Sequence, residues 1–318
     1  MTFTLDAHWV WDFWFADDGE QFHLYYLHAP TSLGDQHLRH RNARIGHAVS
    51  TDLIAWQDLG PVIAPGAAGD IDETATWTGC VVQAPNGTWR MFYTGSRFLS
   101  TDANTNIETV AMAESTDLHQ WTKRPDVVVA ADPRWYETLG TSAWPEEAWR
   151  DPWVFADTSG VGWHMLVTAR SNSGDEMDRG VIGHATSSDL ESWEVQPPLR
   201  ATGAGFTHLE VPQIVTIDER TVLLFSCDSP ALAGAREGET GGVWALEVEA
   251  PTGPYETQRS ALLVDERLYS GRAIQNRDGE WVLLAFENRT TDGGFAGSLS
   301  DPIALGWTDG RLTLKENA

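Results

Sequence analysis

The sequence predicts an all-β fold: a single five-bladed β-propeller over residues 1–318, with four-stranded antiparallel blades around a central funnel. Two observations predict it. Short runs in which apolar and polar residues alternate follow one another along the chain, with turn residues between them. In addition, one nine-residue pattern occurs three times, at intervals of 65 and 72 residues, which indicates a repeated structural unit. Helical periodicity does not extend over a useful length of the sequence.

The predicted strands are rich in aromatic and β-branched residues. Several of them directly follow a turn signal, such as D-D-G before the first or P-N-G before the second, which is typical of β-hairpins. Hairpins repeated along the whole chain favour an antiparallel architecture. The clearest predicted strands are residues 22–27, 88–93, 163–167, 222–225 and 281–286.

The repeated pattern reads A-x-S-x-D-L-x-x-W and begins at Ala48, Ala113 and Ala185. Each interval has room for about four strands of about six residues with their turns, which is one propeller blade. We expect the aspartate of the pattern to bond to its own backbone in a turn and the tryptophan to start the outer strand. About five such units fit the chain, with the last ones degenerate around residues 243–246 and 297–300. The pattern is therefore structural, and its aspartates are not candidates for catalysis.

The charge balance excludes some classes of partner. The chain has 46 acidic and 21 basic side chains, a formal net charge of −25, which repels nucleic acids and anionic membranes. No basic leader with an apolar run begins the sequence and no stretch approaches 18 apolar residues, so we expect a cytoplasmic protein. Cys80 and Cys227 lack the spacing of a zinc site or a disulfide framework. We therefore expect neither a metal nor another cofactor.

Three acidic residues occupy similar places in different units. Asp12 lies among the aromatic rings of W-V-W-D-F-W, where a carboxylate loses hydration and needs a partner, a proton or a chemical role. Asp151, in R-D-P, and Glu210, in E-V-P, each precede a proline and a strand. Each motif alone is more often a surface turn or a cap. Because the inner strands of propeller blades present their first residues to the funnel, we expect the three acids to meet there and to serve glycoside hydrolysis.

Aromatic and polar side chains near these acids are candidates for saccharide binding, since flat rings stack on sugar faces. Strand alternation places Trp14 on the same side as Asp12, facing the funnel, and Trp9 and Trp11 on the other side. His208 could orient the acid two residues away or simply pack. The substrate-binding candidates are Trp11, Trp14, Trp77, Trp149, Arg150, His208, Tyr269 and Arg272.

Three arginines, Arg39, Arg41 and Arg44, are concentrated in one stretch of this acidic chain. Two interpretations remain open. The arginines could bind an anionic group of a substrate, or they could form a rim that pairs with nearby acids, and we favour the second.

Taken in order, W-x-W-D, R-D-P and E-x-P on a repeated β scaffold resemble the motifs of five-bladed propeller glycosidases acting on fructosides. These are the invertase, inulinase and levansucrase group, glycoside hydrolase families 32 and 68. The resemblance covers nearly the whole chain. The first motif is closer to the V-W-D-x-W form of levansucrases than to the N-D-P-N-G form of invertases. Residues 76–82 and 46–53 resemble two further segments of the group. Unlike the invertases, this chain is expected to have no C-terminal β-sandwich.

The resemblance implies a retaining β-fructofuranosidase that acts on a small saccharide. Asp12 would be the nucleophile that forms a fructosyl-enzyme, Asp151 would hold substrate hydroxyls and stabilise the transition state, and Glu210 would act as acid and then as base. Three alternatives stay open: an inverting arabinofuranosidase or xylosidase like those of family 43, a fructosyltransferase, and a carbohydrate-binding propeller without catalysis. The presence of all three acids favours an enzyme.

Overall fold

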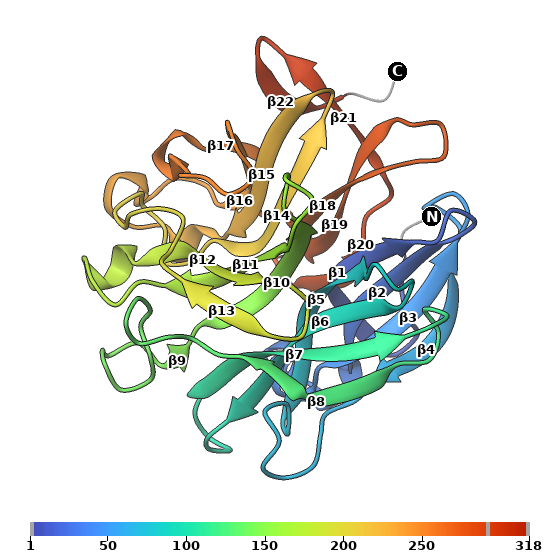
Figure 1. The fold of residues 1–318 in the computed structure, drawn as a ribbon, viewed down its shortest axis with the longest axis horizontal. Helices are drawn as coiled ribbons and strands as arrows, with labels where there is room; N and C mark the ends of the chain where they lie inside the picture. The colour runs from blue at the N-terminus through green and yellow to red at the C-terminus, as the bar shows by residue number, and fades with distance from the viewer. Residues whose placement is uncertain (1–2, 291–292, 316–318) are drawn as a thin grey trace.

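The computed structural model of the chain describes residues 3–290 and 293–315. These residues form five antiparallel sheets arranged around an axis (Figure 1). The first strands of consecutive sheets contact each other, and β18 of the fifth sheet contacts β1 of the first, which closes the ring. The predicted five-bladed β-propeller is therefore confirmed, and each strand that we predicted lies inside a longer observed strand, exceeding it by at most one residue.

The first three blades follow the chain in order, and the second carries β9 as an additional strand parallel to β7. The strands are β1 (His8–Asp17), β2 (Phe22–Pro30), β3 (Arg44–Ser50), β4 (Gln57–Ile63); β5 (Ala75–Gln83), β6 (Trp89–Phe98), β7 (Asn106–Ser115), β8 (Thr122–Val129), β9 (Glu146–Glu147); and β10 (Trp149–Ala156), β11 (Trp163–Arg170), β12 (Gly180–Ser187), β13 (Trp193–Gln196).

The fifth blade differs from the others because β19 pairs with both β20 and β21, so that its third strand is interrupted. The strands of the last two blades are β14 (Glu210–Ile217), β15 (Arg220–Cys227), β16 (Gly242–Glu247), β17 (Ala261–Asp265); and β18 (Leu268–Gln275), β19 (Trp281–Arg289), β20 (Phe295–Leu299), β21 (Ile303–Thr308), β22 (Arg311–Leu314).

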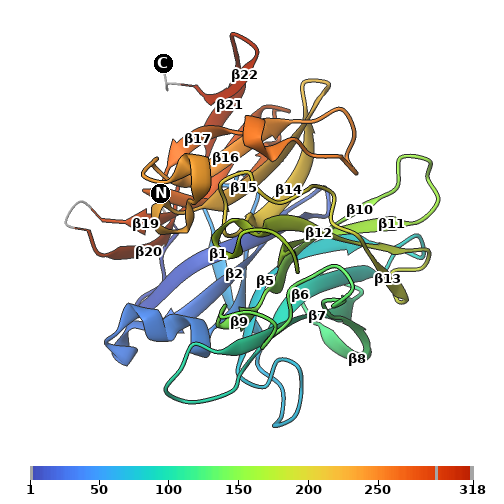
Figure 2. The ribbon, with the colours of Figure 1, turned by 90° about the vertical axis from the view of Figure 1, so that its left-hand side faces the viewer.

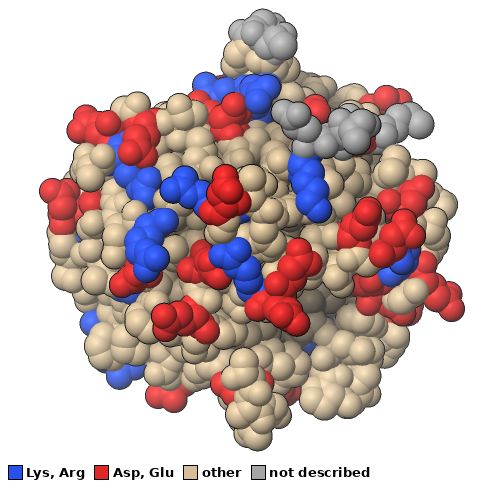
Figure 3. Space-filling view, turned by 90° about the horizontal axis from the view of Figure 1, so that it is seen from above, with Lys and Arg blue, Asp and Glu red and all other residues tan. Residues whose placement is uncertain are grey.

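The helical segments are short 3₁₀ turns in the loops: η1 (Thr31–Leu33), η2 (Gln36–Asn42), η3 (Glu176–Asp178), η4 (Ser229–Ala231), η5 (Gly234–Arg236) and η6 (Thr257–Arg259). None of the described residues belongs to a helix with the length and hydropathy of a membrane span. Acidic side chains are spread over the face seen in Figure 3, with basic side chains between them.

The repeated nine-residue pattern forms the predicted turn in three blades. The Asp52 carboxylate accepts hydrogen bonds from the backbone N–H groups two and three residues further on, at 2.9 and 2.8 Å, and the Trp56 indole donates to the Leu53 carbonyl at 3.1 Å. The copies at Asp117 and Asp189 make the same bonds. The leucine of each copy has a φ of 63 to 67°, a costly conformation for a branched residue, so these bonds hold the turn against strain.

We expect an Asp189→Ala variant to unfold more easily, because two backbone N–H groups lose their acceptor. By analogy with helix N-caps, which bond in the same way, the free energy of unfolding should fall by about 1 kcal/mol. Urea denaturation measures this change, with Ser188→Ala at the exposed variable position of the same turn as the control. Equal stability of the two variants would contradict a structural role for the repeated aspartate.

The first and fifth blades are joined at the seam where the ring closes (Figure 2). Phe3 pairs with Leu299 in an isolated β-bridge beside β1 and β20. At the other end of β1, the Arg277 guanidinium donates to both carboxylate oxygens of Asp17, at 2.8 and 2.9 Å. The seam therefore fixes β1, and with it Asp12, relative to the fifth blade.

Candidate active site

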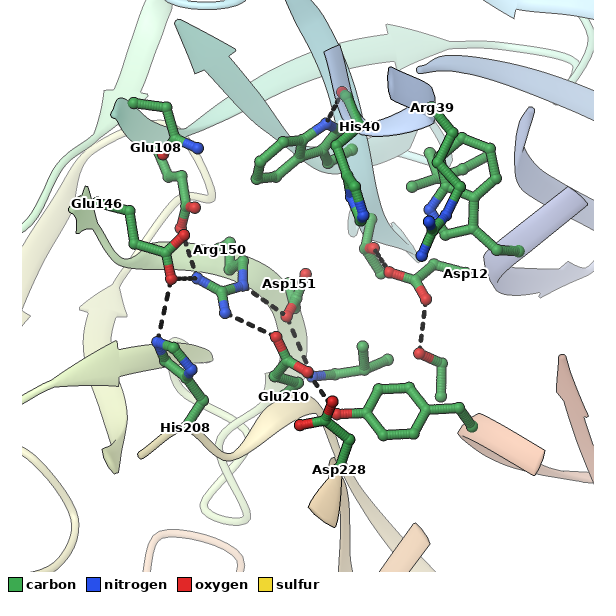
Figure 4. Close-up of a pocket in the computed structure, with 18 of the residues that line it drawn as sticks. Asp12, Arg39, His40, Glu108, Glu146, Arg150, Asp151, His208, Glu210 and Asp228 are labelled. Atoms are coloured by element: carbon green, nitrogen blue, oxygen red, sulfur yellow. Dashed lines mark hydrogen bonds and ion pairs between the residues drawn. The ribbon is translucent and has the colours of Figure 1, made fainter. Parts of the chain in front are cut away.

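One pocket of about 500 Å³ lies at the mouth of the funnel. All five inner strands contribute to its lining, through Asp12 of β1, Thr78 of β5, Asp151 of β10, Glu210 of β14 and Ser270 of β18. The three acids that the sequence singled out therefore converge in one place (Figure 4).

A β-bulge in every inner strand places these residues. The pairing register between first and second strands shifts at Asp12, at Thr78, at Asp151, and just after Glu210 and Tyr269. A bulge leaves a residue unpaired and re-aims its side chain. Three of the unpaired residues are non-glycine residues with positive φ: Asp151 at 57°, Val211 at 52° and Ser270 at 51°. Such backbone strain is often found at functional sites.

The bulge corrects one prediction about the first motif. Trp14 does not face the funnel with Asp12; it is fully buried in the core and stacks on Tyr25, with ring centroids 6.0 Å apart. Trp11, which alternation placed on the opposite side, lines the pocket instead. The reason is that the unpaired Asp12 resets the alternation of the strand.

The other substrate-binding candidates divide into two groups. Trp77, Arg150, His208 and Tyr269 line the pocket. Trp149 and Arg272 do not lie among the described lining residues. Trp149 is fully buried against Tyr136, with centroids 4.7 Å apart, and the buried Arg272 donates to the Pro212 carbonyl at 2.8 Å. These two side chains support the pocket wall from behind.

Each acid has a different set of partners. Asp12 accepts hydrogen bonds from the hydroxyls of Thr78 and Ser270, both at 2.6 Å. Asp151 accepts from the Thr168 hydroxyl at 2.8 Å and from the Val211 backbone N–H at 3.1 Å.

Glu210 is the acid with the strongest donors. It accepts from the Arg150 guanidinium at 2.7 Å and from the Tyr269 hydroxyl at 2.5 Å. His208, a candidate for orienting this acid, instead has its Nε2 atom 3.2 Å from Glu146 Oε1.

These environments separate the pKa values of the three carboxyl groups. Burial raises the pKa of Asp12, with the hydroxyls of Ser270 and Thr78 opposing it. Burial also raises the pKa of Asp151 to about 6, although Arg150 opposes the shift. Burial acts on Glu210 in the same direction, but the Arg150 charge and the Tyr269 hydroxyl hold its pKa below the usual range. Glu210 is thus the most readily ionised of the three.

Sequence reasoning missed a second layer of acids around Arg150. The Arg150 guanidinium lies 2.9 Å from Glu108 and 3.5 Å from Glu146, in addition to its contact with Glu210. Burial raises the pKa of Glu108 to about 8, so this carboxyl group is mostly protonated at neutral pH. These residues come from β7 and β9, and no local pattern marks them.

Asp228 was also missed. It follows β15 directly, is half-buried, and lines the pocket. Burial together with the charge of Glu210 raises its pKa to about 6. Among the described residues, no group of three or more His, Cys, Asp or Glu side chains is arranged to hold a metal ion.

The arginine-rich stretch does not form the rim of arginines paired with acids that we favoured from the sequence. Within the described part of the chain, neither Arg39 nor Arg41, both of which line the pocket, forms an ion pair with a carboxylate. Arg41 donates to the carbonyls of Ser100 and Ala103 instead. The prediction of a rim that pairs with acids is therefore wrong for both residues, because loop carbonyls and aromatic rings take the place of the acids.

Comparisons with known proteins bear on the family and the fold of the chain. Residues 14–314 match the glycosyl hydrolases family 32 N-terminal domain. The chain is 28% identical over 322 residues to a sucrose-6-phosphate hydrolase of Zymomonas mobilis, covering 92% of this chain and 56% of the relative. It is 26% identical over 310 residues to a raffinose invertase of Escherichia coli, covering 92% of this chain and 58% of the relative. The chain thus spans about half the length of the curated relatives it matches.

Solved structures show the same fold. An inulosucrase from Halalkalicoccus jeotgali bound to kestose has a TM-score of 0.78 at 23% identity, over 98% of this chain and 87% of that one. Bacillus subtilis levansucrase has a TM-score of 0.74 at 15% identity, with the same shares covered. The family match spans nearly all of the propeller and begins two residues after Asp12. The chain belongs to glycosyl hydrolase family 32.

Proposed function

We propose that this protein is a retaining glycoside hydrolase that acts on small β-fructofuranosides, with residues 1–318 as one catalytic domain. The observation that carries the proposal is the convergence of Asp12, Asp151 and Glu210, each with its own partners, in the pocket of a family 32 propeller. A retaining glycosidase needs a nucleophile on one side of the glycosidic bond and an acid on the other.

Asp12 is proposed as the nucleophile that attacks the anomeric carbon and forms a fructosyl-enzyme. Among the described residues, its carboxylate accepts from the Thr78 and Ser270 hydroxyls alone, which stabilise the charge without forming a salt bridge. Asp151 is proposed to hold substrate hydroxyls. Hydrogen bonds from sugar hydroxyls strengthen as positive charge develops on the ring, so a fixed carboxylate there stabilises the transition state.

Glu210 is proposed as the acid that protonates the leaving group and then as the base that activates water. Arg150 and Tyr269 both stabilise its charged form. Glu210 must therefore be protonated when the substrate binds, so we expect the activity to be greatest on the acidic side of neutrality.

A Tyr269→Phe variant tests this electrostatic assignment. The Tyr269 hydroxyl donates to Glu210 and lowers its pKa; its removal should raise that pKa, so the acid stays protonated to higher pH. Because Glu210 ionises before Asp12, its titration forms the acid limb of the profile of kcat/KM against pH, and this limb should move to higher pH. A profile with a nitrophenyl fructoside measures the limb, and a limb that stays in place or moves to lower pH would contradict the assignment.

The proposed substrate class is tested with wild-type enzyme, sucrose and a panel of nitrophenyl furanosides and pyranosides. We expect fructose to be released from sucrose and no turnover of arabinofuranosides or xylosides. Turnover of a pentoside alone would favour the inverting alternative, and sugar binding without turnover would favour a binding module. The ratio of oligosaccharide to free fructose at high sucrose concentration separates a transferase from a hydrolase.

A further inference from the structure

Arg39 occupies an unusual place at the pocket. It belongs to η2, and its guanidinium carbon lies 4.1 Å from the ring centroid of Phe295 in β20 and 5.7 Å from that of Trp11 in β1. One guanidinium nitrogen donates to the Gln36 carbonyl at 3.0 Å, while the Gln36 side chain accepts from the Phe295 backbone N–H at 3.0 Å. The arginine is thus held between the first and fifth blades, with its guanidinium pointing toward Asp12 (Figure 4).

The charge of Arg39 is not neutralised by contact. Within the described residues it has no ion-pair partner, and its buried Nε atom has no hydrogen-bond partner. Arg150, by contrast, lies against four carboxyl groups, those of Glu108, Glu146, Asp151 and Glu210. Arg39 is therefore available to act on Asp12.

Asp12 needs such a charge, because its surroundings disfavour ionisation. The titratable groups that act on it are Glu210 of β14 and Asp151 of β10, both acidic, and Arg39 of η2 and Arg272 of β18, both basic. Arg272 already donates to the Pro212 carbonyl. The hydroxyls of Ser270 and Thr78 are the strongest opposition to burial, and the charge of Arg39 adds to them against the neighbouring Glu210 carboxylate.

We propose that Arg39 is the positioning residue of Asp12: its fixed positive charge beside the carboxylate keeps the nucleophile ionised in an otherwise acidic pocket. The inference rests on the proposed function in giving Asp12 the role of nucleophile. Burial lowers the pKa of Arg39 to about 10, so the guanidinium remains charged throughout the working pH range. Trp11 and Phe295 hold it in place by cation–π contact, which leaves its charge free to act.

The charge pairing can be measured without any substrate. The Asp12 carboxyl carbon is followed by NMR against pH in protein labelled with ¹³C-aspartate, and Asp12→Asn identifies its resonance. In Arg39→Met we expect the acid dissociation constant of Asp12 to fall tenfold or more, as for loss of an adjacent arginine. Arg39→Lys should restore most of the wild-type value. Arg39→Gln replaces the methionine variant if that variant does not fold.

Arg277→Met is the matched control. Arg277 also joins the fifth blade to the first, stacks on an aromatic ring, with its guanidinium carbon 3.7 Å from the Phe22 centroid, and pairs with Asp17. A merely structural effect of losing a stacked arginine would appear in both variants. Only Arg39→Met should move the titration of Asp12. Because Asp12 ionises after Glu210, this variant should also move the basic limb of kcat/KM to higher pH and lower its maximum.

An unchanged Asp12 titration in Arg39→Met, or an equal change in Arg277→Met, would overturn the inference. Competitive inhibition of the wild type by inorganic phosphate that disappears in Arg39→Met, with the Asp12 titration unmoved, would overturn it in favour of an anion-binding site. A moved titration in a protein that hydrolyses no fructoside would support the charge pairing and refute the proposed function, so the two failures are distinguishable.

Discussion

An Asp12→Asn enzyme is expected to fold normally and to lose on the order of 10⁴-fold or more in kcat on sucrose, as other enzymes do when their nucleophile is removed. The amide of asparagine cannot form the fructosyl-enzyme. Its oxygen can still accept a hydrogen bond from the hydroxyls of Thr78 and Ser270, which now bond to the carboxylate. Steady-state kinetics measure the loss, and an unchanged thermal unfolding curve shows that the variant is folded.

The control for this variant is Asp52→Asn, which makes the same chemical change in the structural turn of the first blade. It is expected to alter stability and to leave kcat within a factor of about two of the wild type. An Asp12→Asn enzyme that keeps more than a tenth of wild-type turnover would remove Asp12 from the reaction.

A Glu210→Gln enzyme is expected to lose about 10²- to 10⁴-fold in kcat on sucrose, the usual contribution of a general acid. The size of the loss should depend on the leaving group. Because nitrophenolate departs without a proton, the first step on a nitrophenyl fructoside should lose much less. That substrate should instead give a burst of nitrophenol followed by slow turnover, because the second step still needs Glu210 as base.

Glu247→Gln is the control for the acid. Glu247 is the exposed last residue of β16 in the fourth blade, where it pairs with Arg220. Its replacement is expected to leave kcat unchanged on both sucrose and the nitrophenyl fructoside. Equal losses on sucrose and the nitrophenyl fructoside in Glu210→Gln would contradict the role of this residue as acid and would indicate a binding role.

The fold could be predicted because its determinants are local. The turn around Asp52 recurs at Asp117 and Asp189 with the same bonds, and alternating apolar residues mark the strands between the turns. The interrupted third strand of the fifth blade and the additional β9 were not predicted, because neither carries a pattern in the sequence.

The site could be predicted only in part. Asp151 and Glu210 stand beside prolines that mark strand starts, and Asp12 stands among rings that make its charge costly. The bulges that aim these residues carry no such mark. One extra residue in β1 reverses the sides of Trp11 and Trp14, whereas alternation alone predicts that Trp14 faces the pocket and Trp11 does not.

Of the supporting charges, only Arg39 stood out in the sequence, as part of an arginine-rich stretch, and its place beside Asp12 was not predicted. Glu108, Glu146 and Arg39 lie on β7, β9 and η2 rather than on inner strands. They reach the pocket because the ring brings distant segments together, and their importance depends on burial and on charges across the pocket. A single sequence contains no local signal for either quantity.

The most direct test of the central claim, that Asp12 and Glu210 cooperate in a retaining fructosidase, is the stereochemistry of transfer to methanol. Wild-type enzyme turns over sucrose in dilute methanol, and NMR identifies the methyl fructofuranoside, which does not mutarotate. A fructosyl-enzyme on Asp12 requires methyl β-fructofuranoside. Formation of methyl α-fructofuranoside, or hydrolysis with no methyl fructoside at any methanol concentration, would contradict the account.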